Sequence, residues 1–272
     1  MNERTEPKGE RVAKAMARAG LCSRREAERW ILEGRVEVNG RRLETPARVV
    51  AKTDVVAVDG KPLKEPEATR LWRYHKPAGL VTTHRDPEGR PTVFGNLPKD
   101  REMPRVISVG RLDLNTEGLL LLANDGELAR DLENPDRGWL RRYRVRAFGA
   151  ADEKALAKLA KGIEIDGVQY GRIAVAIDRV QGSNIWLTVG LREGKNREVR
   201  KAVEYAGLTV NRLIRVSYGP FQLGKLARGN IAEVPAKVLK EQFGLGGDAE
   251  KRVNKPREKA RRQPRRRPGK PS

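Results

Sequence analysis

Side chains that form disulfides or bind metals are scarce in this sequence. Cysteine occurs once, at Cys22, and histidine twice, at His75 and His84, in 272 residues. A single cysteine excludes an internal disulfide and any cysteine-based metal cluster. Two histidines are also too few for a histidine-rich zinc site. We therefore expect a protein that works without a metal ion.

Long apolar runs are also missing. No stretch approaches the roughly 20 apolar residues that a membrane-spanning helix needs. Residues 1–6 show no apolar core of the kind that a signal peptide contains. These two absences disfavour the membrane and secretory classes, and we expect a cytoplasmic protein.

Basic residues are abundant instead. Lys and Arg total 57 against 36 Asp and Glu, which gives a formal net charge of +21. Eleven basic residues and one acid, Glu258, fall between Lys251 and Ser272, so the body of the chain keeps +11. We expect residues 247–272 to form a disordered basic tail, because such a composition cannot bury enough apolar surface. The basic body favours a nucleic acid as partner.

The length suggests two domains, and the first is predicted at residues 10–58. Apolar residues recur there at helical spacing and stop at Gly20. Ser23 and Glu26 form a capping box, which indicates the start of a second helix. Asn39-Gly40 lies between short alternating runs and predicts a two-residue hairpin.

The outward positions of this first unit are basic, namely Arg11, Lys14, Arg18, Arg24, Arg25 and Arg29. Arg24 and Arg25 open the second helix, whose amides already favour anions, so a phosphate there would also meet guanidinium groups. Charge alone leaves a solvated helical face as an equal alternative. The string LCSRREAERWILEGRVEVNG resembles the S4-like RNA-binding domain, and this resemblance implies that the six basic residues contact RNA.

A linker at residues 59–70, rich in Lys, Glu and Pro, separates a second unit at residues 71–243. Its elements alternate irregularly, with strands predicted at 144–148 and 185–189 and helices at 152–161 and 199–206. This order predicts an α+β domain around a mixed, largely antiparallel sheet flanked by helices. We expect Trp30 and Trp186 in the hydrophobic core, and His75 to pack or to bind backbone.

One acidic residue in a loop is the strongest candidate for chemistry. Asp113 lies beside Arg111 in the glycine-bounded segment 110–118, directly before the apolar run 119–122. We expect that run to be a strand that holds the loop at the floor of a cleft. A calcium-binding loop is excluded because Asn124 stands where the bidentate glutamate should be. From spacing alone, an aspartate that merely caps a turn is the commoner alternative.

The segment 110–132, GRLDLNTEGLLLLANDGELARDL, resembles the signature of the RNA pseudouridine synthases that modify ribosomal RNA and carry an S4-like domain. Further segments that agree with this family are 74–79, 86–93, 142–145, 193–200 and 213–216. The resemblance spans nearly all of the chain except its ends and is closest to the large-subunit pseudouridine synthases of the B type. Asn134 and Arg142 depart from the family pattern, which usually has histidine and lysine there, and Asn134 puts an RNA-contacting role of its loop in doubt.

The resemblance implies roles for particular residues. Asp113 is expected to be the catalytic aspartate, Tyr143 the residue that stacks on the target base, and Arg200 the ionic partner of the aspartate. Arg197 is the alternative candidate for the role given to Arg200. Three residues are expected to bind RNA near this site, namely Arg111, Lys195 and Arg197.

The chemistry of the reaction fits these residue types. The glycosidic bond of uridine must break, the base must rotate, and C5 must join C1′. A carboxylate beside a guanidinium stays ionised and can attack the ribose or remove one of its protons; both routes remain open. Tyr143 offers an aromatic face and a hydroxyl for proton exchange near C5. No cofactor is needed, because the product is more stable than the substrate.

The predicted function is the isomerisation of a specific uridine by a monomeric enzyme. The expected partner is 23S ribosomal RNA, either naked or in a large-subunit assembly intermediate. One alternative is a sibling enzyme that acts on 16S ribosomal RNA or on a neighbouring 23S uridine. The other is a non-catalytic protein of ribosome assembly that binds ribosomal RNA and in which Asp113 only caps its loop.

Overall fold

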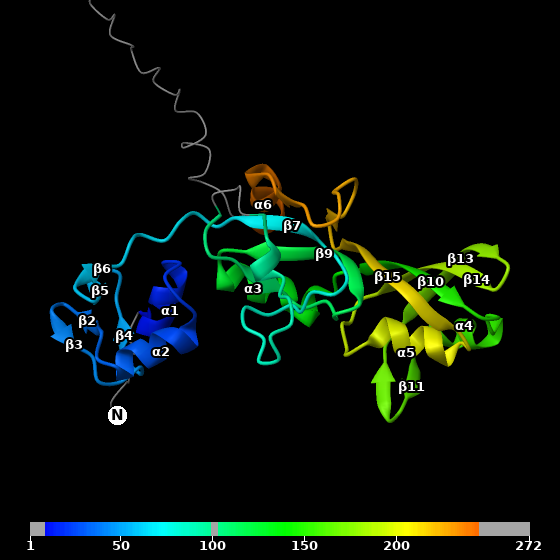
Figure 1. The fold of residues 1–272 in the computed structure, drawn as a ribbon, viewed down its shortest axis with the longest axis horizontal. Coiled ribbons are helices and arrows are strands. Elements are labelled where there is room, and N and C mark those ends of the chain that lie inside the picture. Colours follow the sequence, from blue (N-terminus) through cyan, green and yellow to red (C-terminus); the bar gives the residue numbers. More distant parts are fainter. Residues whose placement is uncertain (1–8, 99–102, 245–272) are drawn as a thin grey trace, which may run out of the picture.

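The computed structural model describes residues 9–98 and 103–244. Over these residues the chain has an α+β fold, with a small N-terminal unit and a larger unit built on one extended sheet (Figure 1). The basic tail predicted at 247–272 lies outside the described residues. Within the described ranges, none of the helices has the length and apolar character needed to cross a bilayer.

The N-terminal unit combines two helices with short strands. Strand β1 pairs with β4, and the other four strands form a sheet in the order β3-β2-β5-β6. The elements are β1 (Glu10–Arg11), α1 (Val12–Arg18), α2 (Arg24–Leu32), β2 (Val36–Val38), β3 (Arg41–Arg42), β4 (Val49–Val50), β5 (Val56–Val58) and β6 (Lys61–Pro62).

Local signals in the sequence determine much of this unit. The Ser23 hydroxyl accepts a hydrogen bond from the Glu26 amide at 3.1 Å, so the predicted capping box is confirmed. Asn39 and Gly40 have φ angles of 52° and 74°, the left-handed pair that a tight hairpin requires. Trp30 packs half-buried against the core, as predicted. Residues 61–62 pair with β5, so this sheet extends into the predicted linker.

The larger unit contains a nine-stranded sheet whose main path runs β13-β14-β10-β15-β9-β7-β17, with β8 and β16 paired at its sides. Its strands are β7 (Leu71–Lys76), β8 (Ile107–Val109), β9 (Thr116–Ala123), β10 (Arg141–Phe148), β13 (Ile173–Gln181), β14 (Asn184–Leu191), β15 (Thr209–Tyr218), β16 (Phe221–Gln222) and β17 (Ile231–Glu233), and a separate hairpin joins β11 (Ile163–Ile165) to β12 (Val168–Tyr170). The pairing of β9 with β15 is parallel and the other pairings of this sheet are antiparallel, which confirms the predicted sheet type.

Helices flank this sheet. They are α3 (Gly126–Glu133), α4 (Glu153–Leu159), α5 (Glu198–Tyr205) and α6 (Ala236–Phe243), with short 3-10 turns η1 (Phe94–Asn96) and η2 (Pro135–Arg137). Strand β9 is buried at all eight positions, because hydrophobic clusters pack against both of its faces. Leu119 and Leu121 belong to one cluster and Leu120 and Leu122 to the other. This strand is therefore a rigid support for the loop that precedes it.

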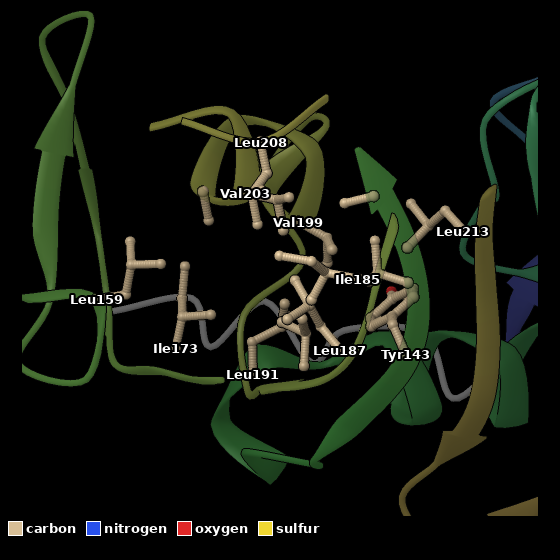
Figure 2. Packing of buried hydrophobic residues seen from close by; sticks show 14 of the residues in the cluster. Tyr143, Leu159, Ile173, Ile185, Leu187, Leu191, Val199, Val203, Leu208 and Leu213 are labelled. Atoms are coloured by element: carbon tan, nitrogen blue, oxygen red, sulfur yellow. The ribbon is translucent and has the colours of Figure 1, made fainter. Parts of the chain in front are cut away.

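A third cluster fills the space between the sheet and helices α4 and α5. Figure 2 shows Val199 and Val203 of α5 together with Leu187 and Leu191 of β14 in this cluster. Tyr143 of β10 belongs to the same cluster. The cluster holds α5 against the sheet, in contact with β15 and near Tyr143 of β10.

The opposite face of β10 and β14 is open to solvent. Arg144 and Arg146 are exposed there. Trp186 of β14 pairs with Arg146 in the ladder, and the Arg144 guanidinium lies 4.8 Å from the centroid of its ring. The prediction of Trp186 as a core residue is therefore wrong, because Ile185 and Leu187 occupy the core-facing positions on either side of it.

Candidate active site

A cavity of about 820 Å³ lies where the loop before β9 meets β10, β15 and the start of α5. Its lining includes Asp113, Tyr143 and Arg200, which come from three segments far apart in the sequence. Arg111, Lys195 and Arg197 also line it. The sequence-predicted residues of the larger unit thus gather around one cavity.

The loop that carries Asp113 is a tight turn. The Thr116 amide donates to the Asp113 carbonyl oxygen at 3.0 Å, and the Gly79 amide donates to the Leu114 carbonyl oxygen at 2.8 Å. The buried strand β9 begins at Thr116 and fixes the end of this turn. The Asp113 side chain is half-buried and makes no hydrogen bond or ion pair to other residues of the described ranges. Its carboxylate is therefore available to a ligand in the cavity.

A buried lysine anchors this turn from below. The Lys76 ammonium donates to the carbonyl oxygens of Asp113, Leu114 and Thr116 at 3.1, 3.2 and 2.9 Å, and to that of Pro77 at 3.1 Å. Its side chain is fully buried. An ammonium group has three protons, so four nearby acceptors satisfy it completely. Lys76 therefore holds the backbone of the turn in place without touching the Asp113 carboxylate.

Sequence reasoning did not single out Lys76. The alternation of β7 contains the missed signal, because Lys76 follows Trp72 and Tyr74 at a spacing of two and shares their buried side of the strand. Burial lowers the pKa of Lys76 from 10.5 to about 8, while the nearby charges of Asp113 and Glu117 act in the opposite direction. Lys76 is therefore still mostly an ammonium group at pH 7 and loses its proton near pH 8.

We predict that replacing Lys76 by Met changes how stability depends on pH. Between about pH 8 and pH 10.5 the folded protein has lost the Lys76 proton, whereas the unfolded chain still binds it. The lowered pKa of Lys76 therefore makes its full contribution to the free energy of unfolding above pH 10.5. That contribution is lost as the pH falls through 8. Urea denaturation at a series of pH values should show the wild type gaining on Lys76→Met across this window. A constant difference in unfolding free energy would contradict the assigned pKa.

Arg200 also contacts this turn. It lies in the first turn of α5 and is 8% exposed, and its Nη2 donates to the Asn115 carbonyl oxygen at 3.0 Å. Burial lowers the pKa of Arg200 and the charge of Arg197 lowers it further, whereas the charge of Asp113 raises it. Within the described ranges no ion pair shorter than 4.0 Å joins Asp113 to Arg200. The direct pairing implied by the family resemblance thus stays a prediction.

Four buried polar atoms at this cavity have no hydrogen-bond partner among the residues that the structure describes. They are Thr116 Oγ1, Glu198 Oε1, Arg200 Nε and Arg215 Nη2. A buried polar group without a partner costs about 1–3 kcal/mol. Such a group is expected to be satisfied by water or by a ligand. Four of them around one cavity, two from guanidinium groups, favour a polar and anionic ligand.

Arg215 and Glu198 are site residues that the sequence did not reveal. Arg215 is 3% exposed, and its Nε donates to the Leu119 carbonyl oxygen at 2.8 Å. Glu198 Oε2 accepts a hydrogen bond from the Lys195 amide at 2.9 Å, and burial raises the pKa of this carboxyl. Both residues lie in segments that resemble the family, but only the fold shows that their side chains turn inward.

The lining of the cavity is basic overall. Its seven basic residues are Arg85, Arg111, Arg141, Lys195, Arg197, Arg200 and Arg215, and its four acidic residues are Asp86, Asp113, Glu133 and Glu198. Among the residues predicted to bind RNA, Lys195 pairs with Glu193 at 2.8 Å. Arg111 and Arg197 are exposed and have no acidic partner within the described residues. The two are therefore available to an anionic ligand.

The six basic residues predicted to bind RNA in the N-terminal unit do not line this cavity. Three of them form ion pairs with acidic side chains: Lys14 with Glu10 and Glu127, Arg18 with Glu10, and Arg29 with Glu26 and Glu33. Arg11, Arg24 and Arg25 are exposed and have no acidic partner in the part of the chain that the structure describes. RNA binding by this set stays a prediction, and these last three are its strongest members.

The side chains of His75 and Cys22 contribute to the fold rather than to the candidate site. His75 Nδ1 donates to the Leu226 carbonyl oxygen at 2.7 Å, which confirms the prediction that this histidine binds backbone. Cys22 is buried, and burial raises the pKa of its thiol to about 11. The thiol is therefore protonated and inert at neutral pH.

The chain is similar to known proteins over most of its length. A family profile described as "RNA pseudouridylate synthase" matches residues 70–205, and an "S4 domain" profile matches residues 10–56. An "Uncharacterized RNA pseudouridine synthase" of Rickettsia felis is 47% identical over 232 residues, which cover 85% of this chain and 100% of the relative. The "Ribosomal large subunit pseudouridine synthase B" of Yersinia pestis is 43% identical over 263 residues, which cover 93% and 82%.

A solved structure shows that the fold is shared. The "Crystal structure of pseudouridylate synthase" aligns with a TM-score of 0.57 over 85% of this chain and 98% of the other, at 23% identity. The alignment covers most of this chain, so the two proteins share a fold.

Proposed function

This chain belongs to the RNA pseudouridine synthase family, and on that premise we propose that it converts one uridine of 23S ribosomal RNA to pseudouridine through Asp113. Its S4 domain implies RNA binding. The choice of large-subunit RNA is supported by relatives named as large-subunit synthases, two of which match 93% of this chain at 42–43% identity.

One observation carries the assignment of the active site. Asp113, Tyr143 and Arg200 line a single cavity, although the chain places them on a turn, a strand and a helix. Asp113 has no partner among the described side chains, and the buried residues Arg200 and Arg215 line the same cavity. A carboxylate held this way can approach the ribose of a bound nucleotide.

The cavity gives each residue a step in the reaction. The target uridine leaves its stack, at a cost of a few kcal/mol, and the base packs on the Tyr143 ring. Asp113 attacks C1′ or removes a ribose proton, and the N1–C1′ bond breaks. The base rotates, and C5 joins C1′ as the bond to Asp113 breaks or as the ribose proton is returned. The proton lost from C5 balances the one gained at N1. Arg200 and Arg215 stabilise negative charge in this site.

A map of pseudouridine in ribosomal RNA tests the proposed substrate. We expect that deleting the gene removes pseudouridine at one position of 23S RNA, and that the wild-type gene restores it. Chemical mapping of both 16S and 23S RNA from the two strains is the measurement. Loss of a 16S site would assign the enzyme to the small subunit, and an unchanged map in both RNAs would contradict the proposal.

A further inference from the structure

One face of the sheet formed by β13, β14 and β10 has no covering layer in the described part of the chain. Helices α4 and α5 pack on the other face through the cluster that contains Val145 and Leu187. Figure 1 shows both helices on that one side of these strands. The uncovered face is therefore solvent-exposed although β10 lies in the interior of the sheet.

Arginine dominates this uncovered face. Strand β10 exposes an arginine at every second residue, and the neighbouring strands add a fourth arginine and a tryptophan. We call this set the arginine face; it consists of Arg142, Arg144, Arg146, Arg179 and Trp186. In the ladders, Arg146 and Arg179 flank Trp186 on either side.

The charges of the arginine face are not neutralised by the protein. None of its four arginines has a carboxylate within 4.0 Å in residues 9–98 and 103–244. Arg146 Nε donates to the neutral Asn184 side chain at 3.2 Å, and the Arg144 guanidinium stacks on Trp186. The one acid nearby on β13, Asp178, accepts a hydrogen bond from Thr188 instead. Some other exposed arginines of this chain do form ion pairs with acids, such as Arg90 with Asp86 and Arg137 with Asp131.

We propose that the arginine face is a second RNA-binding surface, which holds the phosphate backbone of an RNA segment other than the one that carries the target uridine. Neighbouring residues of a strand point to opposite faces. Tyr143 points into the cavity, so Arg142 and Arg144 point away from it. The thickness of the sheet thus separates the arginine face from the target nucleotide.

The chemistry of the face fits an RNA backbone. Guanidinium groups bind phosphate in a bidentate manner and keep their charge at all relevant pH values. Alternate residues of a strand lie roughly 7 Å apart, which gives a row of three cations along β10. Contacts to phosphate orient an RNA without reading its sequence. The face would therefore align a large folded RNA, while the cavity selects the nucleotide. This inference rests on the proposed substrate for its choice of a long ribosomal RNA.

Salt dependence of binding tests the proposal. The variant Arg142→Gln/Arg144→Gln/Arg146→Gln removes three charges and keeps long polar side chains. The slope of log affinity against log salt is negative. If each arginine contacts one phosphate, the variant should make this slope shallower by about 2, since single-stranded contacts contribute about 0.7 each. The measurement is filter binding of full-length protein to a 23S RNA transcript at several salt concentrations.

A matched control separates this surface from net charge. Lys154, Lys158 and Lys161 are exposed on or just after α4, on the side of the sheet that faces away from the arginine face. Their triple change to Gln removes the same charge and should leave the slope nearly unchanged. Equal slopes for the two variants would overturn the proposal.

A measurement on the unaltered protein covers the case in which the triple variant does not fold. A dicarbonyl reagent modifies exposed arginines, and mass spectrometry locates the products. The 23S transcript should protect Arg142, Arg144 and Arg146 from the reagent. Unprotected arginines in a bound complex would overturn the proposal, and would assign the face to a protein partner or to none. Neither assay requires catalysis, so a failure here is distinct from an unchanged pseudouridine map.

Discussion

Replacing Asp113 by Asn is expected to lower pseudouridine formation by roughly 10⁴-fold or more, the scale seen when a catalytic nucleophile or base is removed. Asparagine keeps the shape of the side chain but can neither attack the ribose nor accept its proton. RNA affinity should stay equal or rise slightly, because a negative charge is removed from a cavity whose lining is already basic. Single-turnover assays and binding measurements on the same 23S transcript separate the two effects.

Folding should survive this substitution. The Asp113 side chain makes no hydrogen bond or ion pair within the described residues, and the turn is held through backbone carbonyls by Lys76 and Arg200. Asp136→Asn is the matched control, because Asp136 is exposed and lies outside the cavity. A variant at position 113 that keeps more than a tenth of wild-type turnover would exclude Asp113 as the catalytic group, whichever of the two routes applies.

The N-terminal unit could be predicted because its signals are local. The capping box of Ser23 and Glu26 and the Asn39-Gly40 hairpin each involve residues within a few positions of one another. The apolar run before Ala123 likewise predicted a buried strand, and β9 is buried throughout. Where a structure depends on near neighbours in the chain, composition and spacing were sufficient.

The anchoring of the active-site turn could not be predicted in the same way. Lys76 reaches carbonyl oxygens 37 to 40 positions away, and Arg200 reaches Asn115 across 85 positions. Lysine is usually a surface residue, so the sequence offers no reason to bury one until β7 and β9 are paired. The family resemblance identified the segments, but the fold was needed to identify the atoms that meet.

The error at Trp186 has a similar origin. The run 185–189 alternates Ile, Trp, Leu, Thr and Val, and both sides of it contain a large apolar residue. Its orientation is determined by β10, whose exposed arginines pair with Thr188 and Trp186. A tryptophan ring under an arginine has a favourable cation–π contact at the surface. The strand was therefore predicted correctly, whereas the side on which its tryptophan lies was not.

Replacing Gly118 by Ala is expected to cost about 4 kcal/mol in the free energy of unfolding, among the largest values seen for single substitutions. Gly118 has a φ of 103°, where a side chain is strained by about 1–3 kcal/mol. A Cβ atom there would also lie 2.3 Å from the Arg215 carbonyl oxygen and 2.7 Å from its amide nitrogen. Relief of that clash requires β9 to separate from β15, where Gly118 and Arg215 are paired.

The control for this prediction is Gly229→Ala. Gly229 has a φ of 79°, yet no atom lies within 4 Å of the position that its Cβ would take. It should therefore show only the conformational cost, about 1 kcal/mol. Urea denaturation of both variants measures the difference between their free energies of unfolding, which is the cost of the close approach of the two parallel strands.

Because this pairing also fixes the turn that carries Asp113, the activity of Gly118→Ala should fall even where the protein remains folded. Equal costs at the two glycines would show that β9 and β15 can separate freely at the active site.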